Sequence, residues 1–314
     1  MEHLFLGFFD THFHYFSLLV ATLLVILGAF LLVLKNYKNT KEASNKIWVA
    51  YKPWFIMAPM CLLSVGLGGQ ILICSFFLLS FFSIREFSRA TGLHTDTAFM
   101  FALYAGNVLL YFAVAMNWKT LFASMPTLLF AIFLVIPPIR DEYKQMLPKV
   151  GLTLISILYL AWFPAHLALL AHHPRGYIYL IFLLIGTELN DASAYLCGKL
   201  FGKRLLIPKI SPRKTIEGAL GAFIIVSLYA WFVHSWVPGF NLPLSAMSVL
   251  LMTVGGTLGD LIMSFFKRDI GIKDMGNLIP GHGGLLDRVD SLLLISPFYF
   301  YLILYLVPLI GEAI

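Results

Sequence analysis

YFSLLVATLLVILGAFLLVL, residues 15–34, is an uninterrupted apolar run without a single charged side chain. A helix of about 20 residues is long enough to cross the roughly 30 Å hydrocarbon core of a bilayer. No cluster of basic residues precedes the run, and no small-residue cleavage site follows it. We therefore expect a retained membrane span here and not a signal peptide.

Similar apolar segments recur along the whole chain. The 314-residue sequence is 60% hydrophobic and 12% charged, with a mean hydropathy of +0.85, whereas a soluble domain is about one quarter charged. These values predict an all-α polytopic membrane protein. We expect Pro164 to kink the sixth of its spans, because proline removes a backbone donor. The ten predicted spans are 15–34, 54–67, 70–84, 97–116, 120–138, 150–171, 177–197, 216–236, 243–266 and 291–310.

The distribution of basic residues predicts how the chain crosses the membrane. Of the 22 lysines and arginines, only Lys119 and Arg175 lie outside one set of alternate loops. Those loops are 35–53, 85–96, 139–149, 199–215 and 267–290. Because cytoplasmic loops are enriched in Lys and Arg, both termini should lie outside and the basic loops in the cytoplasm. A multi-pass protein of the cell (inner) membrane, with any active site facing the cytoplasm, is the expected arrangement.

Two function classes are disfavoured by composition. The net charge of +6 is what basic cytoplasmic loops produce, and no basic tail or RNA-binding signature indicates a nucleic-acid partner. The cysteines Cys61, Cys74 and Cys197 all lie in apolar segments without CxxC spacing. A disulfide or zinc framework is therefore not expected.

Carboxylates occur inside or at the ends of the predicted spans. They are Glu188, Asp191, Glu217 and Asp260. An acid in a membrane helix costs roughly 2.5–3.5 kcal/mol on insertion scales, so it needs a partner or a function. Glu188 and Asp191 share one helical face, and Asp260 shares another with Lys267. These stripes indicate an interior polar site, or alternatively helix–helix hydrogen bonds and intramembrane salt bridges.

The loop GKLFGKRLLIPKISPRKTIEG, residues 198–218, is strongly basic. It could anchor anionic lipid head groups, which attract basic side chains near a membrane surface. However, Ser211 and the proline after it predict a turn that directs Arg213, Lys214 and Thr215 towards the start of the next helix. Free amide donors at a helix start bind anions, so the loop also suits phosphate binding.

A second unusual loop, PGHGGLLDRVDS, spans residues 280–291. Its glycines, Gly283 and Gly284 among them, allow a tight turn or the close approach of a ligand. Asp287 begins an acid-rich helix start next to basic side chains, a combination that suits a hard cation bound beside phosphates. His282 could be a metal ligand or could form a hydrogen bond that fixes the glycine turn.

These residues resemble the signature of the phosphatidate cytidylyltransferases, also called CDP-diacylglycerol synthases. The matching blocks are SFFKR (264–268), KD (273–274), PGHGGLLDRVD (280–290), the ND-x-x-AY-x-x-G segment (190–198), FGK (201–203) and ISPRKTIEG (210–218). Together they cover about 190–291. The chain departs from many members at Met263, where they have a carboxylate, and at Met275, where they often have a serine. These departures leave room for a paralogue with altered rate or lipid preference.

The resemblance implies transfer of a cytidylyl group from CTP to phosphatidate, which yields CDP-diacylglycerol and pyrophosphate. It implies an N-terminal transmembrane region, 1–175, and a catalytic transmembrane region, 176–314. The implied catalytic residues are Lys267, Arg268, Asp287 and Arg288. The implied substrate-binding residues are Ser211, Arg213, Lys214, Thr215, His282, Gly283 and Gly284. The implied Mg²⁺ ligands are Asp260, Asp287 and Asp191.

Within this interpretation the basic side chains serve the substrate phosphates and do not merely pair with neighbouring acids. A CTP-dependent polyprenol or phytol kinase is an alternative, but the full HGGxxDRxD block is typical of the cytidylyltransferases. A transporter would be expected to spread polar residues over many spans, whereas here they collect at one end of the last four. The membrane bilayer is the expected environment, and a homodimer is compatible with the sequence.

Overall fold

The apolar segments fold into helices. The computed structural model describes residues 6–35, 48, 54–276 and 283–307. The α-helices are α1 (Thr11–Lys35), α3 (Trp54–Leu67), α4 (Gly69–Thr91), α5 (Thr97–Ala115), α6 (Lys119–Ile139), α7 (Met146–Ile157), α8 (Phe163–Leu169), α9 (Gly176–Phe201), α10 (Ile216–Val233), α11 (Leu242–Leu250), α12 (Gly256–Ile270) and α13 (Leu286–Leu306). Short 3-10 turns occupy Leu6–Phe9, Leu93–Thr95, Leu170–His172 and His234–Trp236.

The predicted all-α membrane architecture is confirmed. Within the described residues, 8 helical segments are long and apolar enough to cross a membrane. Two of these are composite: Met146–His172 combines α7 and α8, and Leu242–Ile270 combines α11 and α12. Thr11–Ile26 and Trp54–Leu67 are shorter apolar helices. Each of the ten predicted spans therefore corresponds to a helical segment of the structure.

Several helices extend past the ends predicted for them, and the extensions of α4 and α13 reach the polar site. Helix α4 continues to Thr91, beyond the predicted end at 84, and α13 begins at Leu286, before the predicted start at 291. An apolar run marks only the part of a helix inside the hydrocarbon, because the backbone hydrogen bonds continue into the polar boundary. As a result Glu86, Asp287 and Asp290 are helical residues.

The helix changes type next to Pro164, where the sequence predicted a kink. A π-helical turn, Leu158–Trp162, joins α7 to α8, and the Phe163 amide donates to the Leu158 carbonyl five residues earlier. Proline has no backbone N–H, so one helical hydrogen bond is absent at Pro164 in any case. The neighbouring amides can therefore change from a carbonyl four residues earlier to one five residues earlier without the loss of another hydrogen bond. A second π-helical turn, Leu251–Gly255, joins α11 to α12 and was not predicted.

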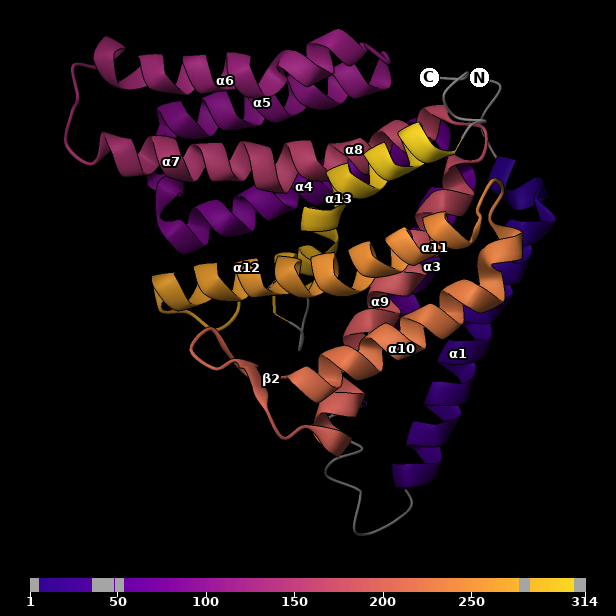
Figure 1. Ribbon diagram of the computed structural model, residues 1–314. Helices are drawn as coiled ribbons and strands as arrows, with labels where there is room; N and C mark the ends of the chain where they lie inside the picture. The colour runs from indigo at the N-terminus through magenta and orange to yellow at the C-terminus, as the bar shows by residue number, and fades with distance from the viewer. Residues whose placement is uncertain (1–5, 36–47, 49–53, 277–282, 308–314) are drawn as a thin grey trace.

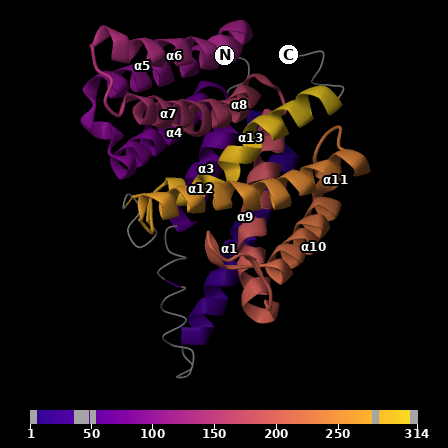
Figure 2. The same ribbon diagram turned by 60° about the vertical axis from the view of Figure 1, so that its left-hand side comes forward.

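Two groups of helices pack on opposite sides of a central pair. Figures 1 and 2 both show α5, α6 and α7 together on one side, α1 and α10 on the other, and α12 and α13 between them. Buried tyrosines connect the elements: the Tyr299 hydroxyl donates to the Tyr179 carbonyl at 2.8 Å, and the Tyr179 hydroxyl donates to the Pro238 carbonyl at 2.9 Å. Each satisfied hydroxyl avoids the cost of a buried polar group without a partner.

Helices α12 and α13 cross at a glycine. A Cβ atom added at Gly259 would lie 2.5 Å from the Asp290 carbonyl oxygen, so only glycine allows the two backbones to approach this closely. The crossing brings Asp260, the next residue of α12, into electrostatic contact with Asp290 of α13. A backbone requirement thus determines where two carboxylates meet.

The basic loop before α10 forms a small hairpin and not the predicted turn at Ser211. Strands β1 (Leu205–Ile207) and β2 (Ser211–Thr215) pair antiparallel, with Leu205 opposite Thr215 and Ile207 opposite Ser211. The proline after Ser211 lacks an N–H, which a two-stranded edge tolerates. The segment is therefore extended where the sequence predicted a bend.

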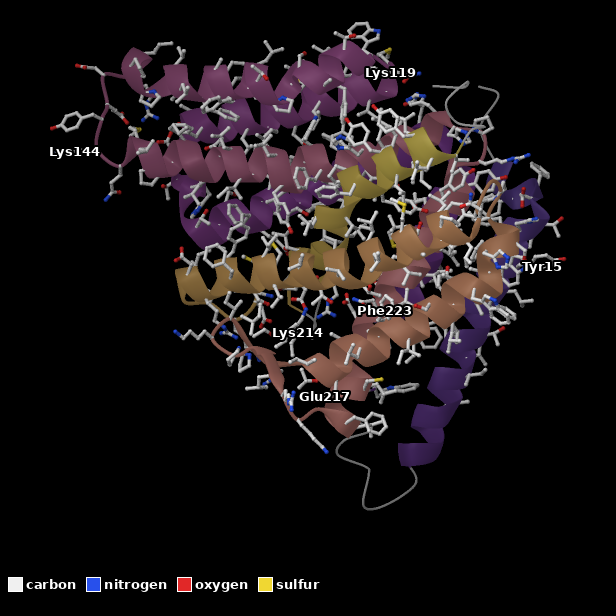
Figure 3. All side chains as sticks on the ribbon, viewed as in Figure 1. Tyr15, Lys119, Lys144, Lys214, Glu217 and Phe223 are labelled. Atoms are coloured by element: carbon white, nitrogen blue, oxygen red, sulfur yellow. The ribbon has the colours of Figure 1, made fainter. Side chains whose placement is uncertain are left out.

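Asp96 ties together three segments on the side of the basic loops. Its carboxylate, 5% exposed, pairs with the Arg140 guanidinium at 2.6 Å and with the Lys149 ammonium at 2.7 Å. Burial alone would raise the pKa of Asp96, but hydrogen bonds from Lys149 and Arg140 outweigh it and lower the pKa below the usual aspartate value. Figure 3 places Lys144, in the α6–α7 connection, at the opposite side of the molecule from Lys119 and Tyr15.

Candidate active site

Three aspartates from three helices form the centre of the polar site. Asp191 of α9, Asp260 of α12 and Asp290 of α13 interact electrostatically with one another. The Ser291 hydroxyl donates to Asp191 Oδ2 at 2.7 Å, and the Ser264 hydroxyl donates to Asp260 Oδ1 at 3.3 Å. Asp191 and Asp260 of the predicted polar stripes therefore face a common region, whereas Glu188 of the α9 stripe is exposed.

Lys214 supplies positive charge to this centre from the hairpin. It occupies β2, immediately before α10, and Figure 3 shows it beside α12. Its ammonium lies 2.6 Å from Asp260 Oδ2 and donates to the Thr257 carbonyl at 3.4 Å. At the end of the strand, Thr215 caps α10 by accepting the Gly218 amide at 3.1 Å. That bond satisfies one of the amides that the sequence predicted to be free for an anion.

A second acid–base pair lies where α13 begins. Lys267 Nζ is 2.8 Å from Asp287 Oδ1, and the side chains are 14% and 6% exposed. Asp287 Oδ2 also accepts the backbone amides of Met275 and Gly284, each at 3.0 Å. The carboxylate of Asp287 thus has three donors, and Lys267, expected to serve substrate phosphates, pairs with it in this structure.

Gly283 gives this segment its tight turn. Its φ angle is +83°, a conformation that L side chains rarely adopt, and a Cβ atom there would lie 3.0 Å from Asp287 Oδ2. The tight turn predicted for the glycines of this loop is therefore present at Gly283. His282 lies outside the described residues.

The remaining predicted residues lie around these two pairs. Arg213 is exposed on β2, and Ser211 starts that strand half-buried. Arg268 is exposed and its Nε donates to the Ile210 carbonyl at 3.4 Å. Arg288 is half-buried on α13 and interacts electrostatically with Glu188 of α9. The structure therefore assembles the lysines with the aspartates and leaves the two exposed arginines, Arg213 and Arg268, at the rim.

Glu86 is a residue of this site that sequence reasoning missed. It is buried near the end of α4, and its two carboxylate oxygens accept the backbone amides of Leu285 and Leu286, each at 2.9 Å. The available signal was an acid directly after an apolar run. The predicted span ends at 84, which places Glu86 in the loop that follows.

The donor set suits a hard divalent cation. The Asn190 Oδ1 atom is buried and has no hydrogen-bond partner, and it lies next in the chain to Asp191. Carboxylate and amide oxygens are the ligands that Mg²⁺ accepts, and it commonly takes one or two carboxylates together with substrate phosphates. Among the described residues no group of three or more His, Cys, Asp or Glu is placed so that it could hold a metal ion by itself. A cation here would therefore take part of its coordination from elsewhere.

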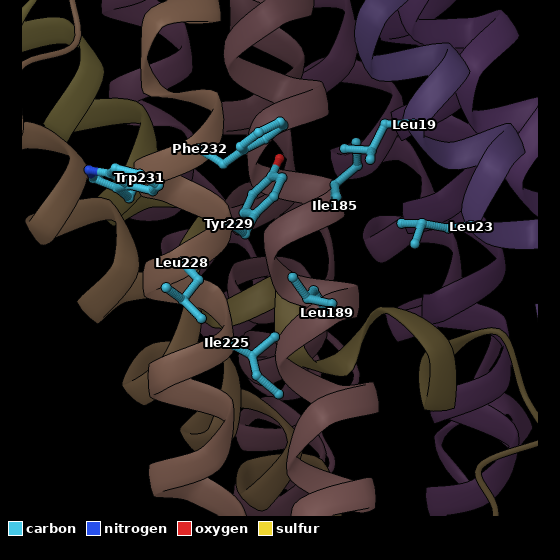
Figure 4. A pocket seen from close by; sticks show the side chains of 9 residues that line it. All are labelled: Leu19, Leu23, Ile185, Leu189, Ile225, Leu228, Tyr229, Trp231 and Phe232. Atoms are coloured by element: carbon cyan, nitrogen blue, oxygen red, sulfur yellow. The ribbon is translucent and has the colours of Figure 1, made fainter. Parts of the chain in front are cut away.

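An apolar hollow is separate from the polar site. A cavity of about 400 Å³ lies between α1, α9 and α10. Figure 4 shows its lining side chains, which are almost all aliphatic or aromatic. Its lining residues are Leu19, Leu23, Ile185, Leu189, Ile225, Leu228, Tyr229, Trp231 and Phe232. Such a surface suits contact with lipid chains and offers no polar chemistry.

Comparisons with known proteins identify the family of this chain. The model of the cytidylyltransferase family matches residues 48–306. A protein of Escherichia coli (strain K12), called "Uncharacterized protein YnbB", is 33% identical over 301 residues, which cover 92% of this chain and 96% of that protein. The chain belongs to the cytidylyltransferase family, and it is a nucleotidyltransferase by class.

Relatives with a named activity are similar over shorter segments. The phosphatidate cytidylyltransferase of Bacillus subtilis is 41% identical over 132 residues, 41% of this chain and 48% of that protein. The phosphatidate cytidylyltransferase of Staphylococcus epidermidis (strain ATCC 12228) is 32% identical over 203 residues, 56% of this chain and 78% of that protein. The chain therefore spans about half the length of the first of these enzymes and more of the second.

Proposed function

We propose that this protein transfers a cytidylyl group from CTP to phosphatidate at the cytoplasmic face of the cell membrane, with formation of CDP-diacylglycerol and release of pyrophosphate. The observation that carries the proposal is the junction of α9, α12 and α13, where two lysine–aspartate pairs adjoin a cluster of aspartates inside a membrane protein. The names of the relatives supply the substrate class.

The chemistry needs positioning and charge compensation more than a strong base. A phosphate oxygen of phosphatidate attacks the α-phosphorus of CTP, a new P–O bond forms, and the bond to the β-phosphate breaks as pyrophosphate leaves. The attacking oxygen is already ionised near neutral pH, so no side chain has to remove a proton. Lys214 and Lys267 would offset the negative charge of the two substrates.

Mg²⁺ is the cofactor that the donor set supports. Asp260 and Asp191, with the unpartnered oxygen of Asn190 beside them, would hold the ion, and Asp287 would contribute if Lys267 moved to a phosphate. When bound, such an ion stabilises negative charge that develops on phosphoryl oxygens. Phosphatidate carries its head group at the membrane surface, which is where a site at the end of the helices would meet it.

A direct assay tests the proposal. Purified protein in lipid–detergent micelles would receive CTP labelled at the α-phosphate, phosphatidate and Mg²⁺, and the products would be separated as lipid and aqueous fractions. We expect label in a CDP-lipid and one pyrophosphate per transfer. Parallel reactions would use CTP labelled at the γ-phosphate and would replace phosphatidate with diacylglycerol or polyprenol. The assignment would be refuted if no labelled lipid formed with phosphatidate, or if the γ-phosphate were transferred to polyprenol.

A further inference from the structure

Glu86 joins the N-terminal half of the chain to the segment that orients Asp287. Its Oε1 and Oε2 atoms accept the amides of Leu285 and Leu286, 199 and 200 residues away in sequence. These amides stand at the start of α13, where a helix has donors without partners inside the helix. A buried carboxylate at this position satisfies them and adds a favourable interaction with the helix dipole.

The loop backbone is closely fitted to the same carboxylate. A Cβ atom at Gly276 would lie 2.6 Å from Glu86 Oε1, and the three nearest atoms are all from Glu86. A Cβ atom at Gly284 would lie 2.6 Å from Glu86 Oε2. The backbone therefore needs glycine at both positions, Gly276 and Gly284, where it passes Glu86.

The fitted backbone is also the backbone that holds Asp287. Met275 and Gly284, whose amides donate to Asp287 Oδ2, are neighbours in sequence of Gly276 and Leu285. A displacement of the loop would therefore move the donors of Asp287 and, through Asp287, the partner of Lys267.

We propose that Glu86 is a positioning residue of the transfer site: its carboxylate fixes the backbone at Gly276 and at residues 284–286, and thereby the geometry of Asp287 and Lys267. The inference rests on the proposed function only in assuming that this pair acts in transfer. Glu86 itself contacts backbone amides and no substrate group.

The first test is Glu86→Gln, with Glu142→Gln as the matched control. Glu142 is half-buried and pairs with Arg140 outside the site. Glutamine keeps one side-chain oxygen that can accept a backbone amide, but it replaces the other oxygen with an NH₂ group. That NH₂ group would face a backbone N–H, and two donors cannot form a hydrogen bond. We expect kcat to fall at least about tenfold while KM for CTP changes little, since loss of a hydrogen bond to a charged group has this magnitude. An unchanged kcat in the folded protein, or an equal effect in Glu142→Gln, would overturn the proposal.

The second test uses the steric fit and does not depend on activity. Gly276→Ala should speed hydrogen exchange of the amides in residues 283–290, because its new methyl group meets Glu86. In a Glu86→Ala background the same change should add little, because the obstructing atoms are gone. Equal increases in both backgrounds would show that Glu86 does not shape the loop. If the wild type fails to transfer cytidylyl groups, the function is wrong, and this exchange experiment still decides the role of Glu86.

Discussion

Lys267→Gln should destabilise the protein and should also slow cytidylyl transfer. The Lys267–Asp287 pair is nearly enclosed, with side chains 14% and 6% exposed, and removal of one partner from a buried pair costs roughly 3–5 kcal/mol. Asp287 would keep the amide donors of Met275 and Gly284, and each hydrogen bond to a charged group is worth about 1.5–3 kcal/mol. These remaining donors lower the expected cost to about 2 kcal/mol.

A double-mutant cycle measures this interaction. Thermal unfolding in detergent would be followed for the wild type, Lys267→Gln, Asp287→Asn and the double variant. For a chain of this size about 2 °C of Tm corresponds to 1 kcal/mol, so Lys267→Gln should lose about 4 °C. The double variant should lose clearly less than the sum of the two single variants, since residues in direct contact couple by 0.5–3 kcal/mol, roughly.

Kinetic measurements on the same proteins distinguish the structural role of Lys267 from its role in binding substrate phosphates. If Lys267 also neutralises substrate phosphates, kcat/KM of the folded Lys267→Gln protein should fall by about 100-fold, the scale of one lost electrostatic stabiliser. An unchanged Tm together with additive single effects would refute the structural pair. Full specific activity in the folded fraction would refute the substrate role.

Three further outcomes follow from the arrangement of charges. Asp260→Asn should lower cytidylyl transfer at least about 100-fold with normal membrane insertion, while Asp269→Asn, an exposed change on the same helix, should not; equal activities would exclude Asp260 from the site. The pKa of Asp96 is lowered in the folded protein, so the stability that its ionised carboxylate contributes is complete at neutral pH and is lost as pH falls below about 4. Asp96→Asn should therefore have a lower Tm than the wild type at pH 7, and its Tm should change less with pH in that acid range. Parallel curves of Tm against pH for the two proteins would contradict this. In a cysteine-free background, a cysteine at Lys203 should react with an impermeant maleimide only in opened cells and one at Trp118 in intact cells; the reverse pattern would invert the proposed orientation.

Local signals explain why the helices could be predicted. Helix α3 matches its predicted range at 54–67, and α6, Lys119–Ile139, exceeds its predicted range by one residue at each end. An apolar run of membrane length is a property of neighbouring residues alone, so no tertiary information is needed to find it. The aspartates inside these runs were equally visible, because a charge in an apolar helix requires an explanation.

Contacts between distant segments could not be predicted in the same way. Helical spacing shows that Asp260 and Lys267 share a face, but it does not show that Asp260 meets Lys214 of the hairpin while Lys267 meets Asp287. The position of Glu86 directly after an apolar run did not show its role, since that role exists only where α4 reaches the start of α13. Which faces meet depends on packing, including the close α12–α13 crossing at a glycine.

The charge balance of the site supports the need for a cation. The start of a helix is normally a ready site for phosphate, but at α13 the amides of Leu285 and Leu286 already donate to Glu86. The nearby lysines, Lys214 and Lys267, are each matched by an aspartate. A nucleoside triphosphate and an anionic lipid would therefore bring negative charge that these pairs do not offset. A divalent ion at the aspartate cluster would supply the missing positive charge and release the lysines towards phosphate oxygens, which is the physical reason to expect that transfer requires Mg²⁺.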